Sequence, residues 1–407
     1  MKSTPPPTRE VNADDKRLAL RHGTGLLDEH MDRLRGLPAH GNTKLRADQL
    51  VLGLLLSFFE PMARSLRQIE GCGDFGGRLD LSRLARSTTS DARAVFDSEH
   101  LKPLIEDLRA RCPGLENADA DLAGIARRIV AADGTYLTTL AGVAWALHHT
   151  KSNGKKQGQC RANVQLDVAT WVPQVVTVSG DDGESEPAAF TRDLLCGVLY
   201  LVDRNFVDFA FLKALLDKGN DVVMRIKSNQ PAMRVTAVNP LAAEDAADGV
   251  TADELVELTG RDAPPGTFRR VTIQTTDRNG KAQTIRLLTN LTDAATVAAR
   301  VIGHAYRLRW QIELFFKWLK CFARMDHLLS TSRQGITTQL YVAVIAVLLM
   351  HLQSGRRVSI YTLAALGRVA RGQQTIAQAM QFIARRERER DLERARQARR
   401  RQRKKLA

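Results

Sequence analysis

The sequence predicts an α/β protein in which a mixed-sheet core carries a β-rich insertion, preceded by a helical N-terminal domain and followed by a helical, basic C-terminus. Three observations support this. Apolar residues recur at helical spacing from Arg46, strand-like apolar runs begin at Ala126, and helical patterns return at Ala294. The chain has 407 residues, which is enough for two or three domains and a large core.

The charge of the chain is strongly unbalanced. There are 60 Lys and Arg against 45 Asp and Glu, a formal net charge of +15. More than half of this excess lies between Arg385 and Lys405, where twelve residues are basic and four are acidic. The excess indicates a polyanionic partner, nucleic acid before a membrane, although a solvated helix or a disordered tail accounts for the terminal run equally well.

The cysteines, the N-terminus and the apolar runs indicate the cellular compartment. The five cysteines form no C-x-x-C pair, so the pattern indicates neither a disulfide framework nor a zinc site and fits a reducing cytoplasm. The N-terminal sequence MKSTPPPTRE lacks the apolar core of a signal peptide. The longest apolar run, Leu340 to Met350, is too short to span a bilayer and predicts a buried helix. We therefore expect no membrane role.

The N-terminal part is predicted to be a flexible segment followed by a helical domain. Residues 1–45 are polar and begin proline-rich, which is typical of loosely ordered chain. Residues 46–122 form the helical, DNA-binding domain that we expect. Its first helix is indicated by apolar residues at helical spacing: Leu50, Leu54, Leu55, Phe58 and Phe59. The segment SRLARSTTSDARAVF looks like helix, polar turn, helix; it is either a helix-turn-helix that contacts DNA or a common pair of short helices.

From Ala126 the spacing of the apolar residues changes from that of helices to that of strands. ARRIVAADGTYLTTL, ANVQLDVAT and PQVVTVSG predict three strands, with the basic loop KSNGKKQGQCR between the first two. A helix (AAFTRDLLCG), a strand (VLYLVDRNF), a second helix (VDFAFLKALLDKG) and a further strand (DVVMRIKS) follow. This order of elements is typical of a ribonuclease-H-like core, which we place in a domain of residues 123–353.

Residues 228–293 interrupt this order and are interpreted as a β insertion. The stretch contains FRRVTIQTT and AQTIRLLTN, joined by a turn with Asn-Gly, which is a good hairpin signal. Helix is predicted again from Ala294 to about Ala323 and from Gln339 to Gln353. Residues 354–407 are predicted to form a basic helical region.

Two aspartates stand at the ends of apolar strands. Asp133 lies in IVAADGTYL and Asp203 in LYLVDRNF. An Asp in so apolar a sequence is costly without a partner, although either one could simply cap a strand or turn. Phosphodiester chemistry with two divalent ions needs carboxylates gathered in one small volume, and carboxylate oxygens suit magnesium or manganese.

The helical sequence AYRLRWQIELFFKWLKCF is predicted to present four polar side chains on one face: Tyr306, Arg309, Glu313 and Lys320. Apolar residues elsewhere on the helix can pack: Leu308, Ile312, Leu314, Phe315 and Leu319. Arg and Lys bind phosphate oxygens and a Tyr hydroxyl can hydrogen-bond to them, so the face suits both metal and phosphate. The alternative is an ordinary amphipathic helix with an ion pair from Glu313 to Arg309 or Lys317.

These residues resemble a family of bacterial insertion-sequence transposases, the DDE group with the signature Y-x2-R-x3-E-x6-K and a β insertion before the final Glu. ADGT around Asp133 looks like the family's first Asp block, and VDRNF around Asp203 like its second. The segments LLTNLTD and HLLSTSRQGITTQLYVAVIAVLL are also similar to family members. The resemblance covers roughly Ile129 to Leu352, with three blocks in the right order.

The resemblance implies cut-and-paste DNA transposition. It implies that Asp133, Asp203 and Glu313 are catalytic and hold Mg²⁺, with Mn²⁺ able to substitute, and that DNA or phosphate is bound by Tyr306, Arg309 and Lys320. The implied partners are double-stranded DNA, as element ends and as target, and a second protomer in a homodimer on DNA. The implied place is the bacterial cytoplasm, in association with the nucleoid.

The sequence departs from the family at several points. Asn205 and Phe206 stand where many relatives have Gly and Tyr. Some relatives stack a flipped base on a tryptophan of the insertion, but this chain has no Trp between Trp171 and Trp310. Trp310 itself either stacks on a base or belongs to the core. A ribonuclease-H-like nuclease that only cuts and a non-catalytic DNA-binding relative stay open as alternatives, although the intact acidic residues argue against the second.

Overall fold

The computed structural model describes most of the chain in two compact units. The units are residues 1–113 together with 318–407, and residues 114–317. The described residues are 27–38, 45–59, 65–71, 85–112, 122, 124–139, 143–150, 156–180, 184–228, 231–276, 280–321, 325, 327–355, 358, 360–370 and 373–406. Most of the segment predicted to be flexible, part of the basic loop after the first strand and part of the Asn-Gly turn lie outside these ranges.

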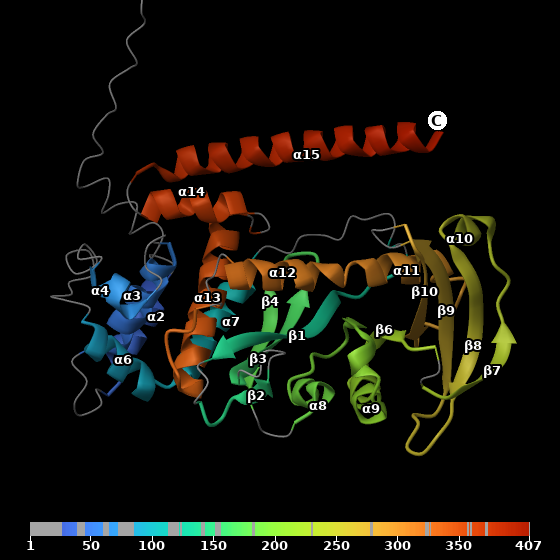
Figure 1. Ribbon diagram of the computed structural model, residues 1–407, viewed down its shortest axis with the longest axis horizontal. Helices are drawn as coiled ribbons and strands as arrows, with labels where there is room; N and C mark the ends of the chain where they lie inside the picture. Colours follow the sequence, from blue (N-terminus) through green and yellow to red (C-terminus); the bar gives the residue numbers. More distant parts are fainter. Residues whose placement is uncertain are drawn as a thin grey trace, which may run out of the picture. The chain divides into compact units, whose positions relative to one another are not determined.

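The first unit is helical in its described residues (Figure 1). Its N-terminal helices are α2 (Asp28–Arg35), α3 (Ala47–Phe59), α4 (Leu66–Gly71), α6 (Arg86–Val95), the 3-10 helix η2 (Ser98–Leu101) and α7 (Lys102–Arg111). Its C-terminal helices are α13 (Arg333–Ser354), α14 (Ile360–Ala370) and α15 (Ile376–Leu406). Helix α13 packs against α3, α6, α7 and η2, so segments from both ends of the chain share one apolar core.

The polar turn predicted in the N-terminal domain is helical. Residues Arg86–Val95, which include STTS, form the single helix α6. The Thr89 hydroxyl donates to the carbonyl oxygen of Ala85 at 3.0 Å, so its polar group is satisfied inside the helix. No polar turn therefore interrupts the described part of SRLARSTTSDARAVF, whose first three residues lie outside the described ranges. Contact of this segment with DNA stays a prediction.

The buried helix predicted at Gln339 to Gln353 is confirmed and is longer than expected. It begins after Ser332, whose hydroxyl accepts a hydrogen bond from the N–H of Gly335 at 3.0 Å. A window of 20 residues, Arg333–Leu352, is long and apolar enough to cross a membrane by length and composition, but 89% of it is buried inside the protein. By its contacts α13 belongs to the first unit, whereas the sequence assigned it to residues 123–353; the predicted domain boundaries stay a prediction.

The second unit is built on one mixed sheet of ten strands in the described residues. The order is β2-β3-β1-β5-β6-β10-β9-β8-β7, with β4 paired to β3. The bounds are β1 (Ile129–Thr139), β2 (Leu147–Thr150), β3 (Lys156–Asp167), β4 (Pro173–Ser179), β5 (Leu199–Val202), β6 (Asp221–Ile226), β7 (Met233–Val238), β8 (Val250–Leu258), β9 (Thr267–Thr276) and β10 (Ala282–Thr289). Strands β1, β5 and β6 are parallel neighbours and the other pairs are antiparallel.

Helices cover the central parallel strands. Helices α8 (Glu186–Thr191) and α9 (Phe209–Asp217) contribute Phe190, Phe211 and Leu215 to a buried cluster with alternate residues of β1, β5 and β6. Helix α11 (Ala299–Arg307) packs against β6, β8 and β9, and Figure 1 shows it on the other side of the sheet. Burial on two faces explains why these strands are almost continuously apolar. The mixed α/β fold is confirmed, while the ribonuclease-H-like assignment stays a prediction.

The β insertion continues the central sheet. Strand β10 pairs antiparallel with β6, and β9, β8 and β7 follow outward. The sequence predicted β9 and β10 but missed β7, β8 and the short helix α10 (Ala243–Ala247). Arg269 of β9 is 0% exposed, forms a bidentate pair with Asp253 of β8 at 2.7 Å, and donates to the carbonyl oxygen of Val297 at 2.7 Å. This pair ties the insertion to the chain that enters α11.

We predict that Asp253→Ala destabilises the protein by about 3–5 kcal/mol, because it leaves the guanidinium of Arg269 buried without its counter-charge. The matched control is Glu254→Ala, which breaks the neighbouring, partly exposed pair with Arg270 at 2.7 Å and is expected to cost about 1 kcal/mol or less. Urea unfolding of the intact chain measures both. Equal losses for the two variants would contradict this assignment.

Candidate active site

The register of the parallel strands brings the two predicted aspartates to the same level. Ala131 of β1 lies beside Leu201 of β5, and continuing this register by two residues puts Asp133 beside Asp203. In the next pair, Val202 lies beside Met224 of β6, so Arg225 follows at the same edge. Asp203 directly follows β5 and Arg225 lies near the end of β6, whereas Asp133 lies inside β1, which continues to Thr139 in its pairing with β3. The prediction that Asp133 ends its strand is therefore wrong, but the parallel pairing still brings these three residues, far apart in sequence, to one level.

The guanidinium of Arg309 joins two of the three predicted acids. Its Nη1 lies 3.1 Å from Oδ2 of Asp133 and 3.4 Å from Oε1 of Glu313, and Nη2 lies 3.4 Å from the same Glu313 oxygen. The ion pair expected of an ordinary amphipathic helix, Arg309 with Glu313, is therefore present, and Arg309 also reaches across to Asp133 on the sheet. The binding of metal or phosphate by this face stays a prediction.

The continuous helix predicted for this signature is two helices. Helix α11 ends at Arg307, and α12 (Trp310–Cys321) begins three residues later. At the junction the N–H of Arg309 donates to the carbonyl oxygen of Tyr306 at 3.0 Å, an i to i−3 bond that tightens the turn. Tyr306 thus lies in the last turn of α11, Arg309 in the turn between the helices, and Glu313 in the first turn of α12.

The apolar positions of the signature are mostly buried. Ile312 and Phe315 are buried as predicted, whereas Leu314 is partly exposed. Trp310 is 49% exposed, which contradicts the core alternative; stacking on a base stays a prediction. Lys320 is half-buried on α12, seven residues after Glu313, and falls within the first unit. Its role stays a prediction.

The two aspartates also bond to local backbone, as the capping interpretation expected. Asp133 accepts from the N–H of Gly134 at 2.9 Å, and Asp203 accepts from the N–H of Asn205 at 2.7 Å, where it begins the 3-10 helix η4 (Arg204–Phe206). Phe206 is fully buried against Phe190 and Phe211, which explains an apolar ring at this position.

Asp133 is a buried acid among other acids. Burial raises its pKa from 3.8 to about 7; Arg309 lowers it, and Glu186, Asp203 and Glu313 raise it further by repulsion. The one arginine bound to it therefore does not offset the cost of its charge. A carboxylate in this state gains strongly from an added cation.

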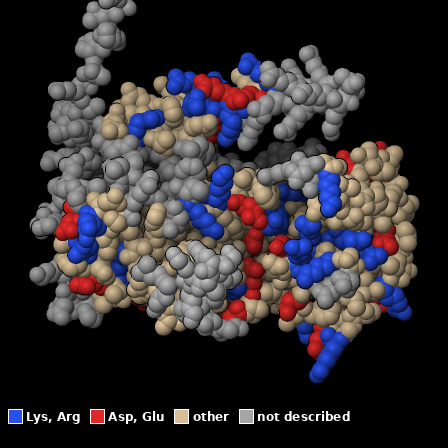
Figure 2. Space-filling model, in the orientation of Figure 1, with Lys and Arg blue, Asp and Glu red and all other residues tan. Residues whose placement is uncertain are grey.

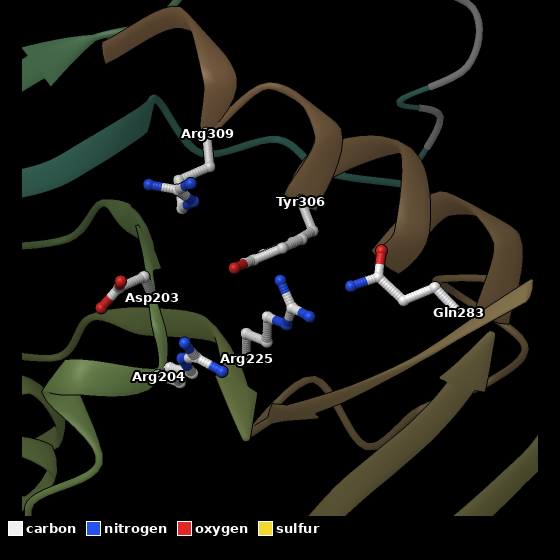
Figure 3. Close-up of a pocket in the computed structure, with 6 residues that line it drawn as sticks. All are labelled: Asp203, Arg204, Arg225, Gln283, Tyr306 and Arg309. Atoms are coloured by element: carbon white, nitrogen blue, oxygen red, sulfur yellow. The ribbon is translucent and has the colours of Figure 1, made fainter. Parts of the chain in front are cut away.

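A cavity of about 280 Å³ lies beside Asp203. Three arginines line it, together with two further polar side chains and Asp203 itself: Arg204, Arg225, Arg309, Gln283 and Tyr306. In Figure 3 the side chains come from the turn after β5, from β6 and β10, and from the end of α11 and the turn that follows it. They point into one space, with the Tyr306 hydroxyl directed between Asp203 and Arg309. Such a cavity is suited to a phosphate group.

Acidic and basic side chains are also separated on the surface of the protein. Figure 2 shows Lys and Arg side chains gathered over the region of β6 and β10, beside a strip of Asp and Glu side chains near β1. An anion held on the basic side would thus lie next to the acidic edge.

Sequence reasoning missed four residues of this site. Arg225, in the apolar strand DVVMRIKS, has the same signal as the aspartates, a charge in an apolar run. Gln283 has no such signal, and Arg204, which lines the same cavity, stands beside Asp203 in VDRNF but was not singled out. Glu186 stands in GDDGESEPAAF among other acids, and only the fold brings it next to Asp133.

The donor set fits a divalent cation. The residues available at the acidic edge are carboxylates, the ligands preferred by Mg²⁺ and Mn²⁺, and Asp133 needs a positive neighbour. Among the described residues no three Asp, Glu, His or Cys side chains lie close enough to hold an ion, since the guanidinium of Arg309 separates Asp133 from Glu313. Arg309 supplies positive charge where a bound cation would also supply it.

Two aspartates at one level of adjacent parallel strands, beside an arginine-lined cavity, are the arrangement expected of a protein that acts on phosphate esters with carboxylates. The chain belongs to the DDE transposase family, because residues 124–349, more than half of its length, match the family described as "Transposase DDE domain".

Three curated relatives carry the name transposase. One from Sinorhizobium fredii is 28% identical over 204 residues, 50% of this chain and 55% of the relative. One for an insertion sequence element of Geobacillus stearothermophilus is 28% identical over 148 residues, 36% of this chain and 37% of the relative. One for an insertion sequence element of Synechocystis is 30% identical over 157 residues, 37% of this chain and 40% of the relative.

These matches are partial. The chain spans about half the length, or less, of the curated relatives it matches. Among solved structures, a piggyBac transposase synaptic complex with hairpin DNA aligns with 94% of this chain and 84% of that chain, at 11% identity and a TM-score of 0.42, a likeness too weak to define the fold.

We predict that the raised pKa of Asp133 makes the metal-free protein less stable as the pH rises from about 4 to 7. The folded protein keeps a proton that the unfolded chain has lost in this window, so raising the pH favours unfolding. Asp133→Asn removes this contribution. The melting temperature of the wild type, followed by circular dichroism without divalent ions, should fall relative to that of Asp133→Asn. A constant difference between them across the window would contradict the pKa shift.

Proposed function

We propose that this protein is a DNA transposase that cleaves at the ends of an insertion sequence and joins them to target DNA. The observation that supports this most is the meeting of Asp133, Arg309 and Glu313, with Asp203 level with Asp133 on the neighbouring strand. Membership of the DDE transposase family agrees with it. The ribonuclease-H-like core that we infer would present these residues at one sheet edge.

The acidic residues Asp133, Asp203 and Glu313 would hold Mg²⁺, for which Mn²⁺ could substitute. The bound ions would activate the attacking oxygen and stabilise the leaving oxygen of a phosphodiester. The carboxylates themselves have one task, to remain ionised and in place. The Gly134 and Asn205 N–H groups fix the orientation of the aspartates.

The arginines and Tyr306 would hold the DNA backbone. Arg225 and Arg204 line the cavity beside Asp203, so a phosphate bound there would be positioned next to the acids. Arg309 has donors directed at Asp133 and Glu313, and it could grip a phosphate with the same guanidinium once the acids have another cation. Tyr306 can donate one hydrogen bond, and Lys320 would act on the backbone further along α12.

The partner that fits this surface is double-stranded DNA, both element ends and target. We further propose a homodimer on DNA, because joining two ends requires two such sites, and the nucleoid of a bacterial cytoplasm as the place of action. The basic helix α15 is an additional candidate for nonspecific DNA contact.

We predict that Asp133→Asn, Asp203→Asn and Glu313→Gln each abolish nicking and joining and leave binding of element ends largely intact, because each keeps the side-chain shape and removes charge. The measurement uses duplex ends taken from the DNA that flanks the coding region, with Mg²⁺, and separates nicked from joined products on denaturing gels.

The DNA products of the wild-type protein also distinguish a transposase from the two alternative functions. Nicking without any joining would favour a nuclease that only cuts, and binding without metal-dependent nicking would favour a non-catalytic relative. Normal joining by any one of the three variants would remove that residue from the site.

We predict that Arg225→Ala weakens the binding of end DNA in EDTA by about 1–3 kcal/mol and reduces the slope of log affinity against log salt by about 1, because it removes one phosphate contact. Arg261→Ala is the matched control: its side chain is 96% exposed on the β8–β9 loop and away from the cavity. Fluorescence anisotropy at several salt concentrations measures both. Equal effects of the two variants would show that the cavity makes no particular phosphate contact.

A further inference from the structure

A fourth acid, Glu186, lies against the residue that follows Asp133. A side chain built on Gly134 would collide with Oε1 of Glu186, and its first carbon would lie 2.9 and 3.1 Å from Cδ and Cγ of Arg161. The backbone N–H of Gly134 also bonds to the Glu186 carboxylate. Glu186 thus fills the space that any other residue at position 134 would occupy.

Glu186 approaches this edge from the face of the sheet opposite to Arg309. Val130 and Ala132 of β1 pack with Phe190 of α8, and Gly134 is the next residue on that face. Asp133 points the other way, toward the α11–α12 junction, where it meets Arg309. The missing side chain at Gly134 is what lets a carboxylate from the α8 face reach the level of Asp133.

Glu186 lacks an ion pair within the described residues, unlike the acid two positions before it. Glu184 pairs with Arg192 at 2.8 Å. The basic residue nearest Glu186 is Arg161, which instead donates from Nε to Asn163 at 2.8 Å and from Nη2 to the carbonyl oxygen of Ser185 at 3.4 Å. Apart from Arg161, the charge that acts on Glu186 is that of an acid, Asp203. Asp133 has the guanidinium of Arg309 beside it, and its other charged neighbours are Glu186, Asp203 and Glu313.

A half-buried carboxylate placed beside other carboxylates is unfavourable unless a cation joins them. We propose that Glu186 is a fourth carboxylate of the divalent-cation site, acting beside Asp133 from the α8 face. This inference rests on the proposed function, since it adds a ligand or a near neighbour to the cation that the other three acids would hold. It also assigns a purpose to Gly134, which is to leave room for this carboxylate.

A purely structural role for Glu186 makes a different prediction. An acid in the first turn of α8, near Arg161, could serve only to stabilise that short helix. Its replacement would then lower the melting temperature and leave cation affinity unchanged.

The test is titration of the full-length, DNA-free protein with Mn²⁺, followed by isothermal calorimetry and by the electron paramagnetic resonance of free Mn²⁺. Glu186→Gln should weaken Mn²⁺ binding by about tenfold or more, and the rise in melting temperature on adding Mn²⁺ should shrink accordingly. Glu184→Gln, the matched control in the same segment, should bind like the wild type.

A second variant keeps every carboxylate and tests the geometry. Gly134→Ala should push Glu186 away and weaken Mn²⁺ binding, and adding it to Glu186→Gln should weaken binding little further, because both changes remove the same contribution. Wild-type affinity in Glu186→Gln, with binding lost in Asp203→Asn, would overturn the role of Glu186 and leave the proposed function standing. Absence of Mn²⁺ binding by the wild type would overturn both.

Discussion

The structure of this site depends on the need to offset the charge of buried carboxylates. Asp133 follows the apolar first residues of β1, and most of the charged groups that act on it are further acids. The guanidinium of Arg309 offsets part of this repulsion by bonding to Asp133 and Glu313 together. Because a bidentate cation has a fixed shape, it also fixes where the α11–α12 junction stands relative to the sheet edge. One ion-pair network therefore sets both the charge and the geometry of the candidate active site.

The sheet supplies the rigidity that this network requires. Strands β1, β5 and β6 are parallel neighbours, and their register puts Asp133, Asp203 and Arg225 at one level. The β insertion adds to this frame, because β10 pairs with β6 and brings Gln283 to the same cavity. The buried pair Arg269–Asp253 then holds the insertion to the chain entering α11, which carries Tyr306. An insertion that looks separable in sequence thus supports the site from the far side of the cavity.

The acidic residues and the arginines of the site lie at different places around the central sheet. The acidic residues lie in β1, directly after β5 and in the first turns of α8 and α12. The arginines of the cavity lie after β5, near the end of β6 and at the α11–α12 junction. A phosphodiester needs both: positive groups that hold its oxygens, and carboxylates that bring cations to the reacting bonds. Two lines of support therefore agree on the proposed transposase function. Family membership comes from the sequence, and the separation of acidic from basic residues comes from their arrangement in space.

The sequence by itself determined the central elements and singled out three acids, whose roles stay predictions. Buried strands such as IVAAD and LYLVD need apolar residues on both faces, so the charge that interrupts each one is visible in the sequence alone. The break between Tyr306 and Trp310 was not visible, because i to i−3 bonds at a helix junction leave the 3.6-residue pattern almost unchanged. Strand β8, VTADELVEL, was missed because its acids are paired only through tertiary contacts, as Asp253 is with Arg269. Glu186 shows the same limit most clearly: nothing in GDDGESEP distinguishes it from Glu184, and only the packing of α8 against β1 brings one of them to Gly134. Local patterns determine which residues are buried or charged, whereas the chain's path in three dimensions decides which charges meet.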